Sequence, residues 1–179
     1  MTVIEEYEKD APEISGRRVL VEMKSTQSDM TGVGFFNVKR PESIDAMFRS
    51  AGSENNEYTL VSEGVLEKAD GRITLSYEET AIEGVEGCST IISFDPAMRG
   101  CVTVERVGPL ASVFVISRGE RIFSVYKTPY GAIDMCIYAK RVLNSLSEDG
   151  GMLILDYAVE LKGLTAQRTK MEVKVTVLD

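Results

Sequence analysis

The sequence predicts an all-β protein folded as a single antiparallel barrel, and two observations support this prediction. From residue 58 to residue 179 the chain reads as a series of short strands separated by turn residues, with no convincing helix between them. Within these strands apolar and polar residues alternate, as expected for a sheet with one buried and one wetted face. We expect about 8–10 strands, and closure into a barrel would remove the exposed edges of an open sheet.

The individual strands are predicted from their period of two. The alternation is clearest in 72–80, 152–162 and 170–177, where every second residue is apolar. Five further strands are predicted at 89–94, 101–107, 112–117, 121–126 and 133–143. The last of these also fits helical spacing, but its apolar residues recur at period two as well. The turn sequence TPYG at 128–131 therefore favours a strand there.

Turn residues lie between the predicted strands. Asp70-Gly71 and Arg118-Gly119 each separate two alternating segments and suit tight hairpins with positive φ. Pro96 and Pro109 also interrupt the ladder, because proline cannot donate a hydrogen bond to a neighbouring strand. The segment EDGG at 148–151 marks the last long connection.

Residues 28–57 interrupt this ladder and form an insertion. Apolar residues recur there at helical spacing, at Ile44, Met47, Phe48 and Ala51. Pro41 near the start and Gly52 just past the end fit the two ends of a short helix. We expect this helix to plug one end of the barrel or to cover its flank. The alternative is a lid over a pocket or a docking helix for a partner.

Length and composition favour one folded domain over residues 1–179. The chain is 44% apolar and 27% charged, which is ordinary for a globular protein. Its net charge of −8 disfavours nucleic acid as a partner, because such binding depends on neutralising phosphates. No apolar segment is long enough for a membrane helix, and the acidic start does not resemble a signal peptide. We therefore expect a cytoplasmic protein without a membrane partner, and the sequence leaves a homodimer open.

The chain lacks several residues and motifs on which common enzymes and metal sites depend. The chain has no histidine, which removes the usual general base at neutral pH and most zinc or non-haem iron sites. Its three cysteines show no CxxC spacing, and no glycine-rich loop has the pattern of a phosphate or dinucleotide site. We expect no metal, no cofactor and no disulfide framework. An enzyme would depend on carboxylates, tyrosines, lysines or thiols, so the sequence leans away from one.

Several ordered segments resemble a known family. They are LSYEET at 75–80, IEGVEGCST at 82–90, TPYG at 128–131 and GG at 150–151 before the strand that contains DY at 156–157. In this order they look like the YwiB-like family, which comprises uncharacterised small bacterial barrel proteins of the calycin superfamily. The likeness runs from residue 58 to the C-terminus, and 19–25 looks like the family's first strand. The insertion at 28–57 is longer than the family's connection.

The resemblance implies a calycin- or lipocalin-like barrel in a bacterial protein, and it supplies no activity and no catalytic residues. A barrel of this size either fills with side chains or holds one small molecule. Candidate ligand-binding residues have a polar tip on an apolar body or a charge, and they are Tyr77, Arg106, Tyr126, Thr128, Tyr130 and Tyr157. Each tyrosine could instead satisfy its hydroxyl on the protein, and Arg106 could pair with a carboxylate instead of anchoring an anion.

Other candidates receive a structural interpretation. Glu78 and Glu79 are adjacent in a strand and should face opposite sides, so they do not form a catalytic pair. Asp156 and Glu160 are about 13 Å apart at the usual strand rise, too far to share a proton. Cys88 is expected to be an unreactive, partly buried thiol. The loop GVEG at 84–87 is either a close-approach site for a ligand or a flexible hairpin loop.

Three functions therefore remain open. The leading hypothesis is a barrel that binds a small, anionic or amphipathic molecule. The main alternative is a structural or protein-interaction barrel with a packed interior and no ligand. An enzyme that uses carboxylate or tyrosine chemistry is the third.

Overall fold

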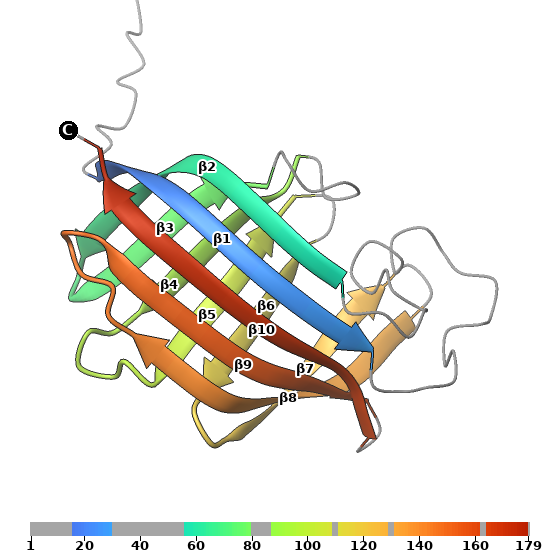
Figure 1. Cartoon of the computed structure of the whole chain (residues 1–179). Helices are drawn as coiled ribbons and strands as arrows, with labels where there is room; N and C mark the ends of the chain where they lie inside the picture. Colours follow the sequence, from blue (N-terminus) through green and yellow to red (C-terminus); the bar gives the residue numbers. More distant parts are fainter. Residues whose placement is uncertain are drawn as a thin grey trace, which may run out of the picture.

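The computed structural model describes residues 16–29, 56–79, 87–108, 111–128, 131–161 and 164–178. These residues form one sheet of ten strands (Figure 1). In chain order the strands are β1 (Arg17–Asp29), β2 (Asn56–Ala69), β3 (Arg72–Glu78), β4 (Ser89–Phe94), β5 (Cys101–Val107), β6 (Ser112–Ser117), β7 (Arg121–Thr128), β8 (Gly131–Asn144), β9 (Gly151–Leu161) and β10 (Leu164–Val177). The strand order across the sheet is β6-β5-β4-β3-β2-β1-β10-β9-β8-β7, and all paired neighbours are antiparallel.

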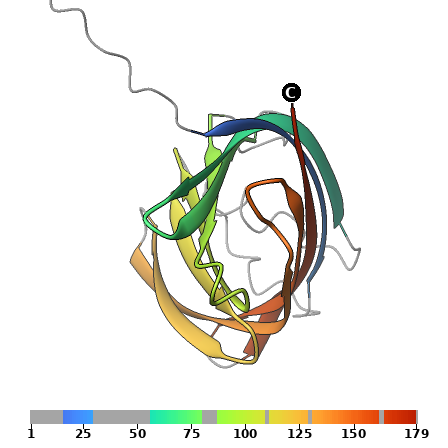
Figure 2. The same cartoon turned by 90° about the vertical axis from the view of Figure 1, so that its left-hand side faces the viewer.

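The sheet curls into a nearly closed barrel, and Figure 2 shows its strands arranged in a ring. The strands β6 and β7 lie at the two ends of the ladder and are not paired with each other. The barrel is joined at this seam by a parallel bridge between Arg118 and Ala139. The backbone N–H of Gly119 donates to the carbonyl of Ala139 at 2.8 Å. This bond links the end of β6 to the middle of β8.

Most of the expected strands are confirmed, with bounds that differ by a few residues. The segment at 133–143, whose periodicity was mixed, lies within β8. The predicted first strand at 19–25 lies within β1, which continues to Asp29. The expected helix at 41–51 falls outside the described residues. Among the residues that the structure describes there is no helix, and hence none able to cross a membrane.

The core follows from the inward-facing positions. On β3 the inward residues Ile73, Leu75 and Tyr77 are buried, as their alternation predicts. The same pattern on the other strands produces one cluster of apolar side chains. Its largest fully buried members include Phe94, Leu60, Leu75, Ile92, Ile116, Ile137, Leu146, Leu153 and Leu155. Burial of this apolar cluster stabilises the barrel.

One of the two predicted hairpin turns is confirmed and the other is wrong. Asp70 and Gly71 have φ values of 51° and 77° and join the paired strands β2 and β3. Gly119 also has a positive φ of 78°, but the strands on either side of it do not pair. The turn at Arg118-Gly119 instead carries the chain across the seam of the barrel. Local turn chemistry predicts the sharp bend but not which strands pair afterwards.

Candidate functional site

A cavity of about 110 Å³ lies inside one end of the barrel. It is near the ends of β1, β3, β5 and β9 and the beginnings of β4, β6 and β10. Its polar lining residues are Ser25, Gln27, Tyr77, Glu79, Thr90, Arg106, Ser112, Tyr157, Gln167 and Thr169. Its apolar lining residues are Val104, Phe114, Val159 and Met171.

Strand register places the polar residues in two rows. In the first row Tyr77 is opposite Thr90, Thr90 is opposite Arg106, and Arg106 is opposite Ser112. Side chains of directly paired residues lie on the same face of a sheet, so this row crosses four strands at one level. The row forms one wall of the cavity.

The second row belongs to the strands β1, β10 and β9. Gln27 is opposite Thr169, and Thr169 is opposite Tyr157. Gln167 precedes Thr169 on the same face, and its Nε2 donates to Oε1 of Gln27 at 2.9 Å. Ser25, opposite Met171, is also buried. These residues form another wall of the cavity.

An ion pair between Glu79 and Arg106 lies at the cavity. The guanidinium Nε donates to Oε2 of Glu79 at 2.9 Å, and Nη2 donates to Oε1 at 3.1 Å. The Thr90 hydroxyl donates to the same Oε1 at 2.7 Å. The Glu79 side chain is 4% exposed and that of Arg106 is 24% exposed. Burial would lower the pKa of Arg106, but the hydrogen bonds and charge of Glu79 outweigh it and raise this pKa. The cavity therefore holds two compensating charges.

The two tyrosines at the cavity remain neutral phenols over the physiological pH range. Burial, reinforced by the negative charge of Glu79, raises the pKa of Tyr77. Burial also raises the pKa of Tyr157, although its hydrogen bond with Thr169 acts in the opposite direction. Both hydroxyls can thus donate and accept hydrogen bonds at the cavity wall.

Three of the six predicted ligand-binding residues line this cavity: Tyr77, Arg106 and Tyr157. Tyr126 and Thr128 lie on β7, which contributes no residue to the described cavity lining, and their side chains are not described. Tyr130 lies outside the described residues. Of the two alternatives for Arg106, the structure shows the carboxylate pair.

Sequence reasoning missed Glu79 and the polar residues of the second row. The signal for Glu79 was its parity, because it follows Ile73, Leu75 and Tyr77 at period two and is 3% exposed. As expected, Glu78 and Glu79 face opposite sides, since Glu78 is exposed. The second row could not be recognised, because Gln27 is 140 residues away from Gln167 in the sequence and about as far from Thr169.

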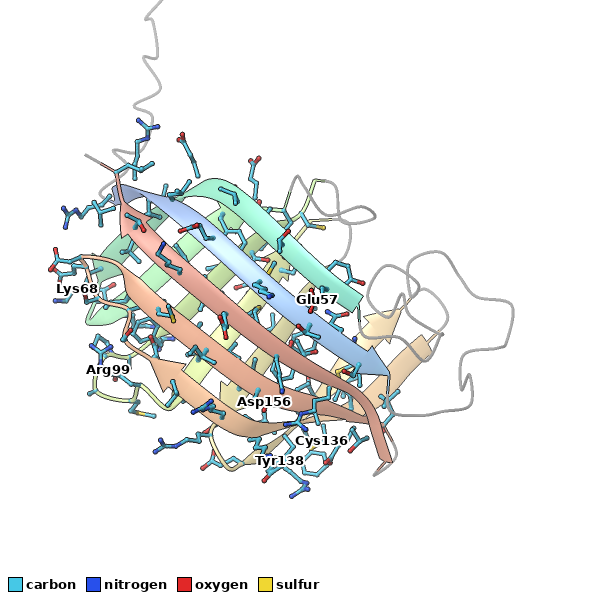
Figure 3. The ribbon with its side chains drawn as sticks, in the orientation of Figure 1. Glu57, Lys68, Arg99, Cys136, Tyr138 and Asp156 are labelled. Atoms are coloured by element: carbon cyan, nitrogen blue, oxygen red, sulfur yellow. The ribbon has the colours of Figure 1, made fainter. Side chains whose placement is uncertain are left out.

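The other chemical candidates lie away from the cavity. Asp156 pairs with Arg168 at 2.8 Å and Glu160 pairs with Arg121 at 3.3 Å, and neither acid lines the cavity (Asp156 is labelled in Figure 3). Cys88 is 2% exposed, as expected for a structural thiol. Most of the GVEG loop at 84–87 lies outside the described residues. In the described part of the chain no group of three metal-ligating side chains is found.

Comparison with known proteins identifies a family and a fold. Residues 44–173 match the family model described as "Domain of unknown function (DUF1934)". The crystal structure of ywiB protein from Bacillus subtilis is similar, with a TM-score of 0.63 and 16% sequence identity over 92% of this chain and 94% of that chain. At this identity the likeness supports the barrel fold alone. No curated protein matches the chain significantly.

Proposed function

We propose that this chain, which belongs to the family described as a domain of unknown function (DUF1934), binds one small polar molecule without net charge inside its barrel. The observation that supports the proposal is the set of buried polar side chains around an unfilled space of about 110 Å³. Burying polar groups costs free energy unless each finds a partner. In a barrel with only a structural role, apolar side chains would fill these inward positions. They do so in another part of this barrel, around Phe94 and Leu75.

The size of the cavity limits the ligand. Apolar cavities of about 150 Å³ hold a benzene-sized molecule, and one water occupies about 30 Å³ of liquid. The cavity is smaller than the usual drug-sized pocket of about 300–1,000 Å³. The ligand would therefore be no larger than a single small ring or a short polar chain.

The charges at the cavity favour a molecule without net charge. Glu79 compensates Arg106, so an anion would have to displace the carboxylate or remain beside it. The polar walls offer neutral donors and acceptors, including the hydroxyls of Tyr77 and Tyr157 and the amide of Gln27. The apolar side chains of Val104 and Phe114 would contact the carbon skeleton. This combination favours an amide, alcohol, lactam or zwitterion over a phosphate ester.

Native mass spectrometry of freshly purified protein tests the proposal. Val104→Phe adds a ring at the cavity wall, whereas Val113→Phe makes the same change at an exposed position of the neighbouring strand β6. We expect a small extra mass in the parent protein and in Val113→Phe that is lost on denaturation, and a bare mass in Val104→Phe. An extra mass that survives Val104→Phe unchanged would place the ligand outside the cavity and contradict the proposal.

A second candidate function, protein interaction on the outer surface, is supported by a different observation. An open groove lies over the last residues of β8 and the first residues of β9, and Arg99, Gly100 and Arg118 also line it. It is lined by two arginines and by exposed apolar side chains. Deletion or charge reversal of residues that line this groove should leave the mass of the ligand bound inside the barrel unchanged. This result would separate the two functions experimentally.

A further inference from the structure

The open groove over the last residues of β8 and the first residues of β9 has both a charged and an apolar lining. Its volume of about 510 Å³ lies within the range of about 300–1,000 Å³ that is typical of ligand pockets. Arg99 and Arg118 supply two positive charges, and β8 and β9 supply the apolar side chains. No acidic residue belongs to the described lining, although the chain has a net charge of −8. The groove is therefore a locally positive site on an acidic protein.

The apolar side chains lie on the outer face of the barrel. Leu143 is directly opposite Ile154, and Met152 shares a face with Ile154 because the two are separated by one residue. The neighbouring residues Val142 and Leu153 are buried, whereas Leu143 and Met152 are 42% and 39% exposed. An apolar side chain of a partner would gain free energy by covering this exposed area.

The end of β8 holds Arg99 in position. The Nη1 of Arg99 donates to the carbonyl of Leu146 at 2.8 Å and to the carbonyl of Asn144 at 3.3 Å (Arg99 is labelled in Figure 3). A guanidinium has five N–H donors, and those on Nε and Nη2 have no partner among the described residues. The side chain is therefore fixed at the groove and keeps donors for a ligand.

Arg118 adds a second charge beside Arg99. The backbone N–H of Arg118 donates to the carbonyl of Gly100 at 2.8 Å, which extends the pairing of β6 with β5 by one residue. A Cβ added at Gly100 would lie 4.0 Å from Nε of Arg118, so the arginine side chain passes close to this glycine. The side chain is exposed and has no ion pair or hydrogen bond with a described residue. Its charge is therefore available to an incoming anion.

We infer that this groove recognises the C-terminal residue of a partner protein, whose free carboxylate binds Arg99 and Arg118. The apolar side chain of the same residue contacts Leu143 and Met152. This inference rests on the second candidate function, protein interaction at the groove.

The chemistry of the lining favours a chain end over an internal segment. Arginine binds a carboxylate through two parallel hydrogen bonds, and backbone carboxylates are recognised in this way at other protein surfaces. A C-terminal apolar residue carries its carboxylate and its apolar side chain on one Cα, so it can contact both linings at once. In an extended internal segment an acidic residue and its apolar neighbour point to opposite faces, so only one of them would enter the groove.

NMR titration of the isotope-labelled full chain with two short peptides tests this inference. The probe is acetyl-Gly-Ser-Gly-Leu with a free carboxylate, and the matched peptide has a C-terminal amide instead. We expect the acid to shift the amide signals of Leu143 and Met152 and to bind at least about fivefold more tightly than the amide, since amidation removes both ion pairs. Arg118→Gln should weaken binding of the acid by about two- to fivefold and leave binding of the amide unchanged.

Arg72→Gln is the matched control, because Arg72 is an exposed arginine on β3 that does not line the groove. It should leave the affinity for both peptides unchanged. Arg72 and Arg118 are both exposed, so we expect both variants to fold.

Three outcomes would overturn the inference. Equal binding of the acid and the amide at the groove would leave protein interaction in place but remove carboxylate recognition. Equal binding of acetyl-Gly-Leu-Glu-Gly-amide, whose carboxylate belongs to an internal side chain, would assign the groove to an acidic segment within a chain. Absence of binding by all three peptides would contradict both the inference and the second candidate function.

Discussion

Glu79 and Arg106 form a two-point ion pair inside the barrel, with contacts of 2.9 and 3.1 Å between the guanidinium and the carboxylate. The carboxylate is almost fully buried, and a third donor, Thr90, completes its hydrogen bonding at 2.7 Å. A buried charge that loses its partner is costly, whereas replacing the whole pair with apolar side chains is often neutral. The pair therefore sets the charge of the cavity. Substitution of one or both residues tests how much the pair contributes to the stability of the protein.

Glu79→Gln should destabilise the protein by about 2–4 kcal/mol, because it leaves the partly buried Arg106 without a counter-charge. Adding Arg106→Met should recover much of this loss. Urea unfolding of the single and double variants measures both effects. Glu63→Gln, which breaks the exposed pair with Arg18, is the matched control and should have a much smaller effect, because solvent screens this pair. Equal losses for Glu79→Gln and Glu63→Gln would contradict the assignment of a buried pair.

The cavity tyrosines should ionise late in an alkaline titration followed by phenolate absorbance. Burial raises the pKa of Tyr77 and Tyr157, so the unfolded chain loses these protons first, near pH 10. Stability should consequently fall as the pH rises above about 10. Tyr77→Phe and Tyr157→Phe should each remove part of the late absorbance change, and the double variant should remove it altogether. A late change of undiminished size in the double variant would refute this explanation.

The Asp156–Arg168 pair should contribute stability at neutral pH that disappears in acid. The hydrogen bonds from Arg168 lower the pKa of Asp156, so the contribution is present above the unfolded pKa of about 3.9 and is lost as the pH falls through the lower, folded pKa. Because the pair is partly exposed, its contribution should be below ~1 kcal/mol. Asp156→Asn should lower the free energy of unfolding at pH 7 and leave it unchanged near pH 2. A difference that persists in acid would show that packing, not charge, is responsible.

Gly150 should be irreplaceable by alanine, because its turn brings it against β10. Its φ is 90°, and an added Cβ would lie 2.4 Å from the carbonyl oxygen of Val175. Gly119, with a φ of 78° and nothing within 4 Å of an added Cβ, is the matched control. Gly119→Ala should cost about 1–2 kcal/mol from backbone strain alone, and Gly150→Ala clearly more. Thermal unfolding of the two variants compares them, and equal costs would mean that the turn moves aside freely.

The sequence predicted the strands well because alternation reports directly which face is buried. Arg106 follows Val102 and Val104 at period two and lines the cavity, and Glu79 follows Tyr77 in the same way, so parity could have pointed to both residues. Pairing across the barrel was not predictable in this way. The contact between Gln27 and Gln167 and the failure of β6 to pair with β7 depend on how the whole sheet curls.

Binding of a small molecule in the barrel is tested most directly by the electron density inside the cavity in a high-resolution crystal structure of the freshly purified protein. We expect connected density larger than a water, within hydrogen-bond distance of the Tyr77 or Tyr157 hydroxyl and beside an intact Glu79–Arg106 pair. Separate water peaks alone, or side chains that close the space, would contradict the claim that this barrel carries a small polar molecule.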